Sequence, residues 1–307
     1  MKGRSNSMSK KLLLGIIIVL LITNIATLLF WNQDEKIVLN DNNGKEVEKK
    51  GDVAKVGGEK ITYKEWINAL TSNFGENQLK KMIDRSVVEQ LAKENNIVVD
   101  EKVIERELAF LSSMQGVLAE EEIAANEEKW KQDIMYRYQL EQLLTMDIDI
   151  PKESIKAHYD EYKNQYNFLA SMQVSHIIVD NFDTAEKVKK ELDQGAAFPL
   201  LAQEYSGDEE SRNDGGYLGF ITTSSQFFPS GYEEVAKEMK EGTYSEPFQV
   251  DTGVAIIYLH RKLPSVTFTY DEIKPYVKSE LALQQSQQSL SVDSLWDNLE
   301  IEWIYED

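Results

Sequence analysis

The stretch of residues 170–262 contains His176 and Asp208, which belong to residue types used in acid–base chemistry. His176 lies in the middle of Met172–Val179, an alternating run rich in β-branched residues that predicts a strand. Asp208 opens the acidic loop SGDEESRNDGG. Histidine changes its charge near neutral pH, so it can serve in proton transfer or polarise a bound group. A histidine in such a strand is more often a core residue, so its position alone does not establish a site.

The elements around these two residues predict a small antiparallel α+β domain. In the first strand, His176 shares a face with Val174 and Ile178, whereas Ser175 and Ile177 occupy the other face. The later elements are expected to be helices over 184–194 and 197–205, a strand over 217–220, a helix over 232–240, and strands over 247–250 and 254–260. Gly195 ends the first of these helices and suits a left-handed cap, and Gly242 closes the helix over 232–240. The order β-α-α-β-α-β-β is typical of the α+β class.

Several other chemistries find little support in the sequence. The acidic loop lacks the alternating ligands and the terminal glutamate of an EF-hand. The three histidines do not have HExxH spacing, and no Gly-x-Ser-x-Gly motif occurs, so a metal-dependent or serine hydrolase is poorly supported. Cysteine is absent, which excludes disulfides, thiolate nucleophiles, Cys-type zinc sites and a lipid-modified N-terminal cysteine.

A series of motifs links this stretch to a known family. In chain order they are VSHIIV, F-x-x-L-A-x-E-Y-S-x-D (198–208), G-G-x-L-G (215–219), G-x-x-x-E-P-F (242–248) and T-G-V-A-I-I (252–257). Over residues 168–263 they resemble the parvulin-type (PpiC, rotamase) peptidyl-prolyl cis-trans isomerases. The flanking helical segments, with their VAKVGGEKIT opening, resemble those of the exported foldases PrsA and SurA. The resemblance implies isomerisation of peptidyl-prolyl bonds without a cofactor, together with chaperone activity.

The same resemblance implies which residues form the site. His176 matches the first-strand histidine of the family, and Asp208 matches the loop position, held by Cys or Asp, beside the substrate carbonyl. The other polar members of the cluster correspond to Ser206 and Thr252. The apolar slot for the proline ring corresponds to Leu218, Phe228 and Tyr232, with the choice between Phe228 and its neighbour Phe227 left open.

One position departs from the family pattern. Where the family has a second histidine, in G-x-H-I-I, this chain has Ala255. The paired histidines support each other's orientation, so Ala255 leaves His176 to be held by Thr252, Asp208 or water. Strand alternation puts His260 on the opposite face from Ala255, which makes it a poor substitute. Two hypotheses follow: an isomerase with an impaired site, or a non-catalytic chaperone whose degenerate domain only binds proline-containing segments.

Helical periodicity dominates the segment before the first strand, residues 52–166. After a Gly57–Gly58 turn, Thr62 and Glu65 have the spacing of a capping box. The apolar stripes that follow normally form a core, and a groove for unfolded segments is the alternative. The tail, 265–307, predicts a helix over 268–290 and an apolar end that packs on residues 52–166. The isomerase domain, 167–264, is therefore expected to be inserted in a mostly helical, chaperone-like module.

The N-terminal segment predicts a membrane anchor. Residues 12–30 form an apolar run just long enough to cross a bilayer core of about 30 Å, and Trp31 suits the far interface. All four basic groups of the first 31 residues precede it, so residues 1–11 are expected to stay cytoplasmic. A cleaved signal peptide is the alternative, although its cleavage site would be poor. The anchor, 12–31, is followed by a polar linker, 32–51, and the bulk of the chain is expected to be extracytoplasmic.

The charge of the chain limits its partners. The formal net charge is −20, and the first 31 residues contribute four positive charges, so the remainder carries −24. Such a surface repels nucleic acid, which makes a nucleic-acid partner improbable. The expected partners are unfolded or partly folded exported polypeptides, with the membrane bound through the N-terminal helix. The sequence does not determine the oligomeric state.

Overall fold

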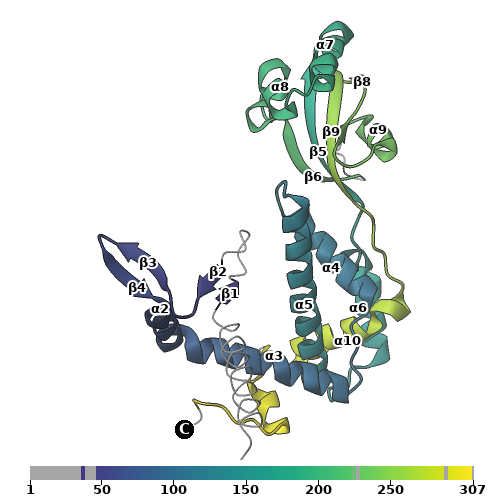
Figure 1. Ribbon diagram of the computed structural model, residues 1–307. Coiled ribbons are helices and arrows are strands. Elements are labelled where there is room, and N and C mark those ends of the chain that lie inside the picture. Colours follow the sequence, from purple (N-terminus) through teal and green to yellow (C-terminus); the bar gives the residue numbers. More distant parts are fainter. Residues whose placement is uncertain (1–35, 39–45, 224, 226–228, 287–289, 306–307) are drawn as a thin grey trace, which may run out of the picture. The chain divides into compact units, whose positions relative to one another are not determined.

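The computed structural model describes residues 36–38, 46–223, 225, 229–286 and 290–305. The chain divides into two compact units, one formed by residues 1–83 with 302–307 and the other by residues 84–301. Helix α3 (Glu76–Glu94) runs through the boundary between them. Each unit is described separately, with the elements labelled as in Figure 1.

The first unit contains two small hairpins and the start of the helical array. Strands β1 (Lys36–Val38) and β2 (Glu46–Glu48) pair antiparallel, as do β3 (Asp52–Val56) and β4 (Glu59–Thr62). Helix α2 (Tyr63–Leu70) follows, and a π-helical turn (Thr71–Gly75) leads into α3. The predicted capping box is confirmed, because the Thr62 side chain accepts from the Glu65 amide and Glu65 accepts from the Thr62 amide.

The second unit contains a group of helices that precede or follow the sheet in sequence. They are α4 (Glu101–Ser113), α5 (Glu120–Thr145), α6 (Lys152–Tyr162) with a 3₁₀ turn (Lys163–Tyr166), α10 (Tyr270–Ser286) and a 3₁₀ helix (Asp293–Asn298). Helix α10 packs against α5 and α6. Ile104, Ile134 and Ile273 share one buried core, so segments far apart in sequence are packed together. Farther along the tail, the Trp296 indole donates to Asp84 at 2.7 Å.

The sheet occupies the middle of the sequence and has the strand order β6-β5-β9-β7, with β8 also paired to β9. All its pairings are antiparallel. Its strands are β5 (Ser171–Val179), β6 (Tyr217–Thr222), β7 (Thr243–Tyr244), β8 (Phe248–Val250) and β9 (Gly253–Leu263). The mixed α+β class with a small antiparallel sheet is confirmed. The short strand β7 was not expected from the sequence.

Helices cover both faces of this sheet (Figure 1). Helices α7 (Phe182–Asp193) and α8 (Phe198–Tyr205) pack on one face through Val188, Leu201 and Ile177. Helix α9 (Tyr232–Glu238) packs on the other through Tyr232, which is buried with Ile257. The predicted left-handed Gly195 is confirmed, with φ +91° just after α7.

The predicted transmembrane helix, residues 12–31, lies outside the described residues. Among the residues that the structure does describe, none of the helices combines the length and the apolar character needed to cross a bilayer.

Candidate active site

His176 is the centre of a buried polar cluster on the α9 side of the sheet. It lies on β5 opposite Ile257 of β9, and its side chain and backbone together are only 4% exposed. Its ring Nδ1 is 2.7 Å from the Tyr232 hydroxyl. Its ring Nε2 is 2.8 Å from Asp208 Oδ2 and 3.0 Å from Ser211 Oγ. Both ring nitrogens therefore have side-chain partners, which fixes the orientation of the ring.

Asp208 reaches His176 from the loop that follows α8. The start of this loop is fixed to β5, because the Gly207 amide donates to the Ile178 carbonyl at 2.7 Å. Ser211 then donates its hydroxyl and its backbone amide to Asp208 Oδ2. The Asp208 side chain keeps 24% of its surface exposed, whereas the His176 side chain keeps 6%. Asp208 is therefore the charged group through which the cluster reaches the surface.

Tyr232 contacts the His176 ring from helix α9. It is the first residue of α9, it follows Gly231 at φ +85°, and it is 0% exposed. Its ring meets the His176 ring edge-on at 5.9 Å and the Phe248 ring edge-on at 5.4 Å. The hydroxyl of a fully buried tyrosine needs a hydrogen-bond partner, and here that partner is His176.

The protonation states of the cluster follow from burial and hydrogen bonding. Burial lowers the pKa of His176, and the neighbouring Asp208 offsets this only in part, so the imidazole is neutral at pH 7. Although burial alone would raise it, hydrogen bonds from Ser211 and His176 hold the pKa of Asp208 below its ordinary value. Burial, aided by the charge of Asp208, raises the pKa of Tyr232. At neutral pH the cluster thus contains a carboxylate, a neutral imidazole and a neutral phenol.

The Gly215–Gly216 pair lets the loop return tightly against β5. The carbonyl of Gly216 accepts from the His176 amide at 2.8 Å. Gly216 has φ +76°, and a Cβ atom there would lie 2.0 Å from the His176 carbonyl oxygen. Only glycine meets both requirements, so this dipeptide holds the backbone around the histidine.

The remaining predicted residues have different surroundings. Ser206 is buried and accepts from the amides of Ile178 and Asp208, so it stabilises the loop backbone. Thr252 is exposed in the turn between β8 and β9. Leu218 is partly buried and packs on the same face as Tyr232. Phe227 and Phe228 lie outside the described residues.

Sequence reasoning missed two of the partners of His176. Ser211 was not identified, although it stands three residues after Asp208 in a loop that must turn sharply. Tyr232 was assigned to the proline slot rather than to the imidazole.

Ala255 is 0% exposed and lies opposite Ile178, so the position of the missing histidine is filled by packing. Within the described part of the chain, no cluster of His, Cys, Asp or Glu is suited to hold a metal ion.

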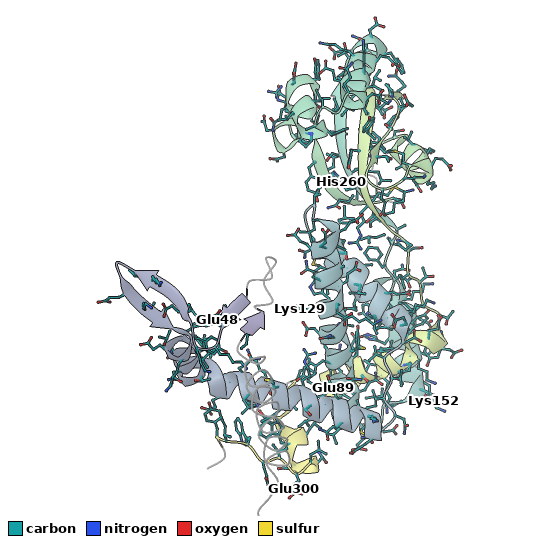
Figure 2. All side chains as sticks on the ribbon, viewed as in Figure 1. Glu48, Glu89, Lys129, Lys152, His260 and Glu300 are labelled. Carbon is teal, nitrogen blue, oxygen red and sulfur yellow. The ribbon has the colours of Figure 1, made fainter. Side chains whose placement is uncertain are left out.

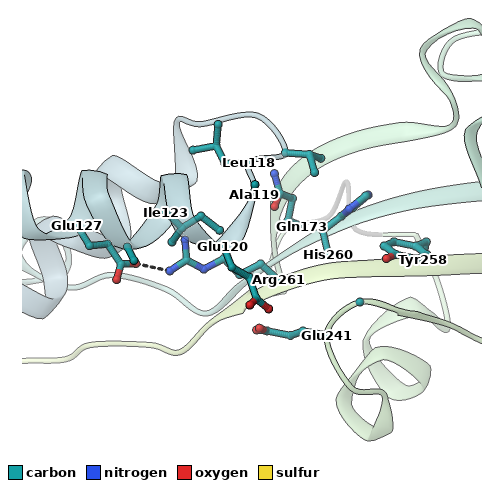
Figure 3. A pocket seen from close by; sticks show the side chains of 13 residues that line it. Leu118, Ala119, Glu120, Ile123, Glu127, Gln173, Glu241, Tyr258, His260 and Arg261 are labelled. Atoms are coloured by element: carbon teal, nitrogen blue, oxygen red, sulfur yellow. Dashed lines mark hydrogen bonds and ion pairs between the residues drawn. The ribbon is translucent and has the colours of Figure 1, made fainter. Parts of the chain in front are cut away.

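The second strand histidine is His260 of β9, which is labelled in Figure 2. Its contact with Ser175 places it on the face of the sheet opposite His176. Its Nε2 is 2.8 Å from Ser175 Oγ, and its ring contacts those of Tyr217 and Tyr258. It lines a cavity of about 520 Å³, where Glu127 of α5 is ion-paired with Arg261 (Figure 3). The prediction that His260 faces away from Ala255 is confirmed, so it does not substitute for the missing histidine.

Known proteins resemble this chain over most of its length. The family described as "PPIC-type PPIASE domain" matches residues 150–275. YacD of Bacillus subtilis (strain 168), to which a peptidyl-prolyl cis-trans isomerase activity is ascribed by name, is 37% identical over 254 residues, or 82% of this chain and 85% of YacD. The foldase protein PrsA of Geobacillus kaustophilus (strain HTA426) is 32% identical over 241 residues, or 76% of this chain and 80% of that protein. The crystal structure of PrsA from Bacillus cereus covers 84% of this chain and 95% of its own, at 23% identity and a TM-score of 0.33.

Proposed function

The chain belongs to the PpiC-type peptidyl-prolyl cis-trans isomerase family, and we propose that it is a membrane-anchored foldase that isomerises peptidyl-prolyl bonds in exported polypeptides. The observation that carries this proposal is the buried His176 ring held between Asp208 and Tyr232, at the positions of the family motifs. We propose His176, Asp208, Ser206 and Thr252 as the polar members of the site. Ser206 hydrogen-bonds to the amides of Ile178 and Asp208 rather than to the imidazole.

The reaction needs a setting that favours the twisted amide. A planar peptidyl-prolyl bond has a rotation barrier of about 18–20 kcal/mol and relaxes over tens to hundreds of seconds. Twisting removes amide resonance and withdraws negative charge from the carbonyl oxygen. A carboxylate beside that oxygen, as proposed for Asp208, repels the planar form more than the twisted one and so lowers the barrier. The neutral imidazole and Ser211 hold this carboxylate in place and keep it ionised.

The proline ring requires an apolar slot next to the carboxylate. Leu218 is partly exposed on the Asp208 side of the sheet and is proposed as one wall. Tyr232 is fully buried, so we propose that its ring forms the floor beneath the slot. Phe228, or its neighbour Phe227, is proposed for the remaining wall. A pyrrolidine ring is apolar and stacks well on aromatic faces, which is why such residues suit it.

The helical segments are proposed as a chaperone module, formed by residues 52–166 and 265–307 around the isomerase domain, 167–264. The shared core of Ile104, Ile134 and Ile273 supports the association of the helices before the sheet with helix α10 after it. The clients are unfolded or partly folded exported polypeptides, and no nucleic-acid partner is proposed because the body of the chain is strongly acidic.

The proposed location is the cell membrane, with residues 12–31 as a single retained span, residues 1–11 cytoplasmic and residues 32–51 as linker. Added protease should digest residues 52–307 in spheroplasts but leave an N-terminal epitope protected until the membrane is lysed. Release of the whole chain into the medium would contradict a retained anchor.

A second candidate function is a holdase that binds proline-containing segments without catalysis. Ala255 is the observation that favours it, since it removes the second histidine of the family pattern. Both functions suppress aggregation of unfolded clients, so only the isomerase rate separates them.

The deciding experiment is a proline-limited refolding assay with the full-length chain in detergent. The isomerase predicts acceleration of the slow refolding phase that grows with enzyme concentration. His176→Ala and Asp208→Ala should abolish most of this acceleration and leave suppression of client aggregation intact. Aggregation suppression without acceleration at any concentration would replace the isomerase with the holdase.

A further inference from the structure

The Tyr232 hydroxyl lies 2.7 Å from Nδ1 of His176, the ring nitrogen that Asp208 does not contact. We propose that Tyr232 is a positioning residue, which holds His176 in a single tautomer and orientation so that Nε2 always faces Asp208. The inference rests on the proposed isomerase function and assigns to Tyr232 a role beyond that of an apolar wall.

The tautomer of His176 follows from what each partner can donate. Asp208 is ionised, and a carboxylate has no proton to donate, so the proton between them belongs to His176 Nε2. A neutral imidazole protonated at Nε2 has a bare lone pair at Nδ1. That lone pair needs a donor, and the Tyr232 O–H at 2.7 Å supplies it. The alternative tautomer would face Asp208 with a lone pair and would turn Nδ1 from an acceptor into a donor toward the Tyr232 hydroxyl, so Asp208 and Tyr232 together disfavour it.

The surroundings of Tyr232 hold its ring in place. The residue is 0% exposed, and its ring packs edge-on against Phe248 and His176. Its amide donates to the Pro229 carbonyl at 3.2 Å at the start of α9. A ring fixed on several sides in this way presents its hydroxyl in one direction, toward Nδ1.

The small side chain of Ala255 is the counterpart of the tyrosine. Ala255 lies opposite Phe248 on β8 and opposite Ile178 on β5, and it belongs to the same buried cluster as Tyr232. Phe248 in turn contacts the Tyr232 ring. A histidine at position 255 would enter space that these aromatic rings already fill. The cluster therefore packs with a tyrosine at 232 and an alanine at 255, and a histidine at 255 would require the surrounding side chains to pack differently.

This pairing reverses the expectation for a restored histidine. From the sequence alone, Ala255→His would be expected to repair an impaired site. With Tyr232 present, the added imidazole overpacks the cluster, so Ala255→His should lower activity and stability.

The test uses the full-length chain and measures both the histidine tautomer and the isomerase rate. Two-bond ¹H–¹⁵N spectra report the tautomer, and His176 is assigned by comparison with His158→Gln and His260→Gln. The wild type should show His176 protonated at Nε2 only, and Tyr232→Phe should show both tautomers. The same substitution should lower kcat/KM about ten-fold, the size expected for one buried hydrogen bond to a catalytic group. Most of the loss should be in kcat.

Tyr217→Phe is the matched control, because it also removes one hydroxyl hydrogen bond from this sheet, to Gln173 rather than to His176. It should leave the His176 tautomer and kcat/KM unchanged.

Three results would overturn the inference: a wild-type His176 protonated at Nδ1, a Tyr232→Phe variant with an unchanged tautomer, or equal losses in Tyr232→Phe and Tyr217→Phe. If Tyr232→Phe fails to fold, the wild-type spectrum still tests the inference, because a His176 protonated at Nδ1 would refute it. A wild type with the expected tautomer but no isomerase rate would refute the proposed function and leave the role of Tyr232 as the support of His176 standing.

Discussion

The two faces of the sheet present nearly matched histidines, only one of which has the surroundings of a site. His176 and His260 each lie on a strand, each has a ring nitrogen within 2.8 Å of a hydroxyl, and burial lowers the pKa of both. The difference is the carboxylate. Asp208 bonds directly to His176, whereas Glu241, which lines the cavity beside His260, accepts from the Lys262 amide instead.

This difference shows what turns a strand histidine into a candidate catalyst. Burial and a hydroxyl partner occur on both faces and are what any satisfied core histidine requires. Among the hydrogen-bond partners of His176 and His260 named above, only Asp208 is an ionised side chain. It is held by the imidazole and still reaches solvent. The following predictions separate the two faces, beginning with the substitution of largest expected effect.

The backbone around His176 should be the most sensitive point. Gly216→Ala combines a left-handed φ of +76° with a Cβ only 2.0 Å from the His176 carbonyl oxygen. Strain and collision together should cost about 3–5 kcal/mol of unfolding free energy. The loss is measured by urea denaturation, and the isomerase rate should disappear with it.

Gly195→Ala is the control for this substitution. Gly195 also has a positive φ, +91°, but a Cβ there meets no atom within 4 Å. Its cost should be only the left-handed strain, about 1–2 kcal/mol. Equal losses at the two glycines would show that contact with the His176 carbonyl contributes nothing.

The next largest difference between the two faces is expected when one negative charge is removed from each. Asp208→Asn keeps the shape but loses the charge that bonds His176, so kcat/KM should fall about 10- to 100-fold, as for a lost charge-assisted hydrogen bond. Glu241→Gln removes a charge from the His260 face and should leave the rate unchanged. Similar losses in the two variants would mean that general electrostatics, rather than the His176 contact, supports the reaction.

The sequence predicted most of the sheet because its signals are local. Alternation in β5 predicted that His176 and Ser175 lie on opposite faces of the sheet. Alternation in β9 predicted the same for Ala255 and His260, and both predictions agree with the structure. The turn glycines were equally readable, since a positive φ leaves few other choices.

What the sequence could not supply were pairings set by tertiary contact. Tyr232 is 56 residues from His176, and nothing in either neighbourhood signals that the hydroxyl points to the imidazole. The start of α5 carries no Ser or Thr cap that the sequence could signal. The helix begins at Glu120, where Glu122 accepts from the Ala119 amide. Strand β7 is two residues long and depends wholly on pairing with β9.

Lowering the pH should destabilise the fold through both His176 and His260. His176 and His260 have folded-state pKa values below the ordinary 6.5, so the unfolded chain takes up protons first as the pH falls. Stability should therefore be constant above pH 6.5 and fall below it, by at most about 1.4 kcal/mol per pH unit for each histidine. Urea denaturation between pH 7.5 and 5.5 measures this slope.

The two histidines can be distinguished within that slope. His260→Gln keeps a polar side chain beside Ser175 and should remove the His260 share of the acid-induced loss. Asp208→Asn should steepen the share of His176, because it removes the carboxylate that partly restores its pKa. A slope that is the same in wild type, His260→Gln and Asp208→Asn would contradict the buried, neutral state of both rings.

The smallest effect is expected at Ser175, the hydroxyl partner of His260. Ser175→Ala removes a neutral hydrogen bond of 2.8 Å and should cost about 1 kcal/mol of unfolding free energy. It should leave kcat/KM unchanged, whereas Tyr232→Phe, the same loss of one hydroxyl on the other face, should lower it. A double-mutant cycle of Ser175→Ala with His260→Gln isolates the pair energy from other contacts. If Ser175→Ala slowed catalysis as much as Tyr232→Phe, the hydroxyl–histidine pairs would be coupled through the sheet, and the carboxylate would no longer explain why one face is the site.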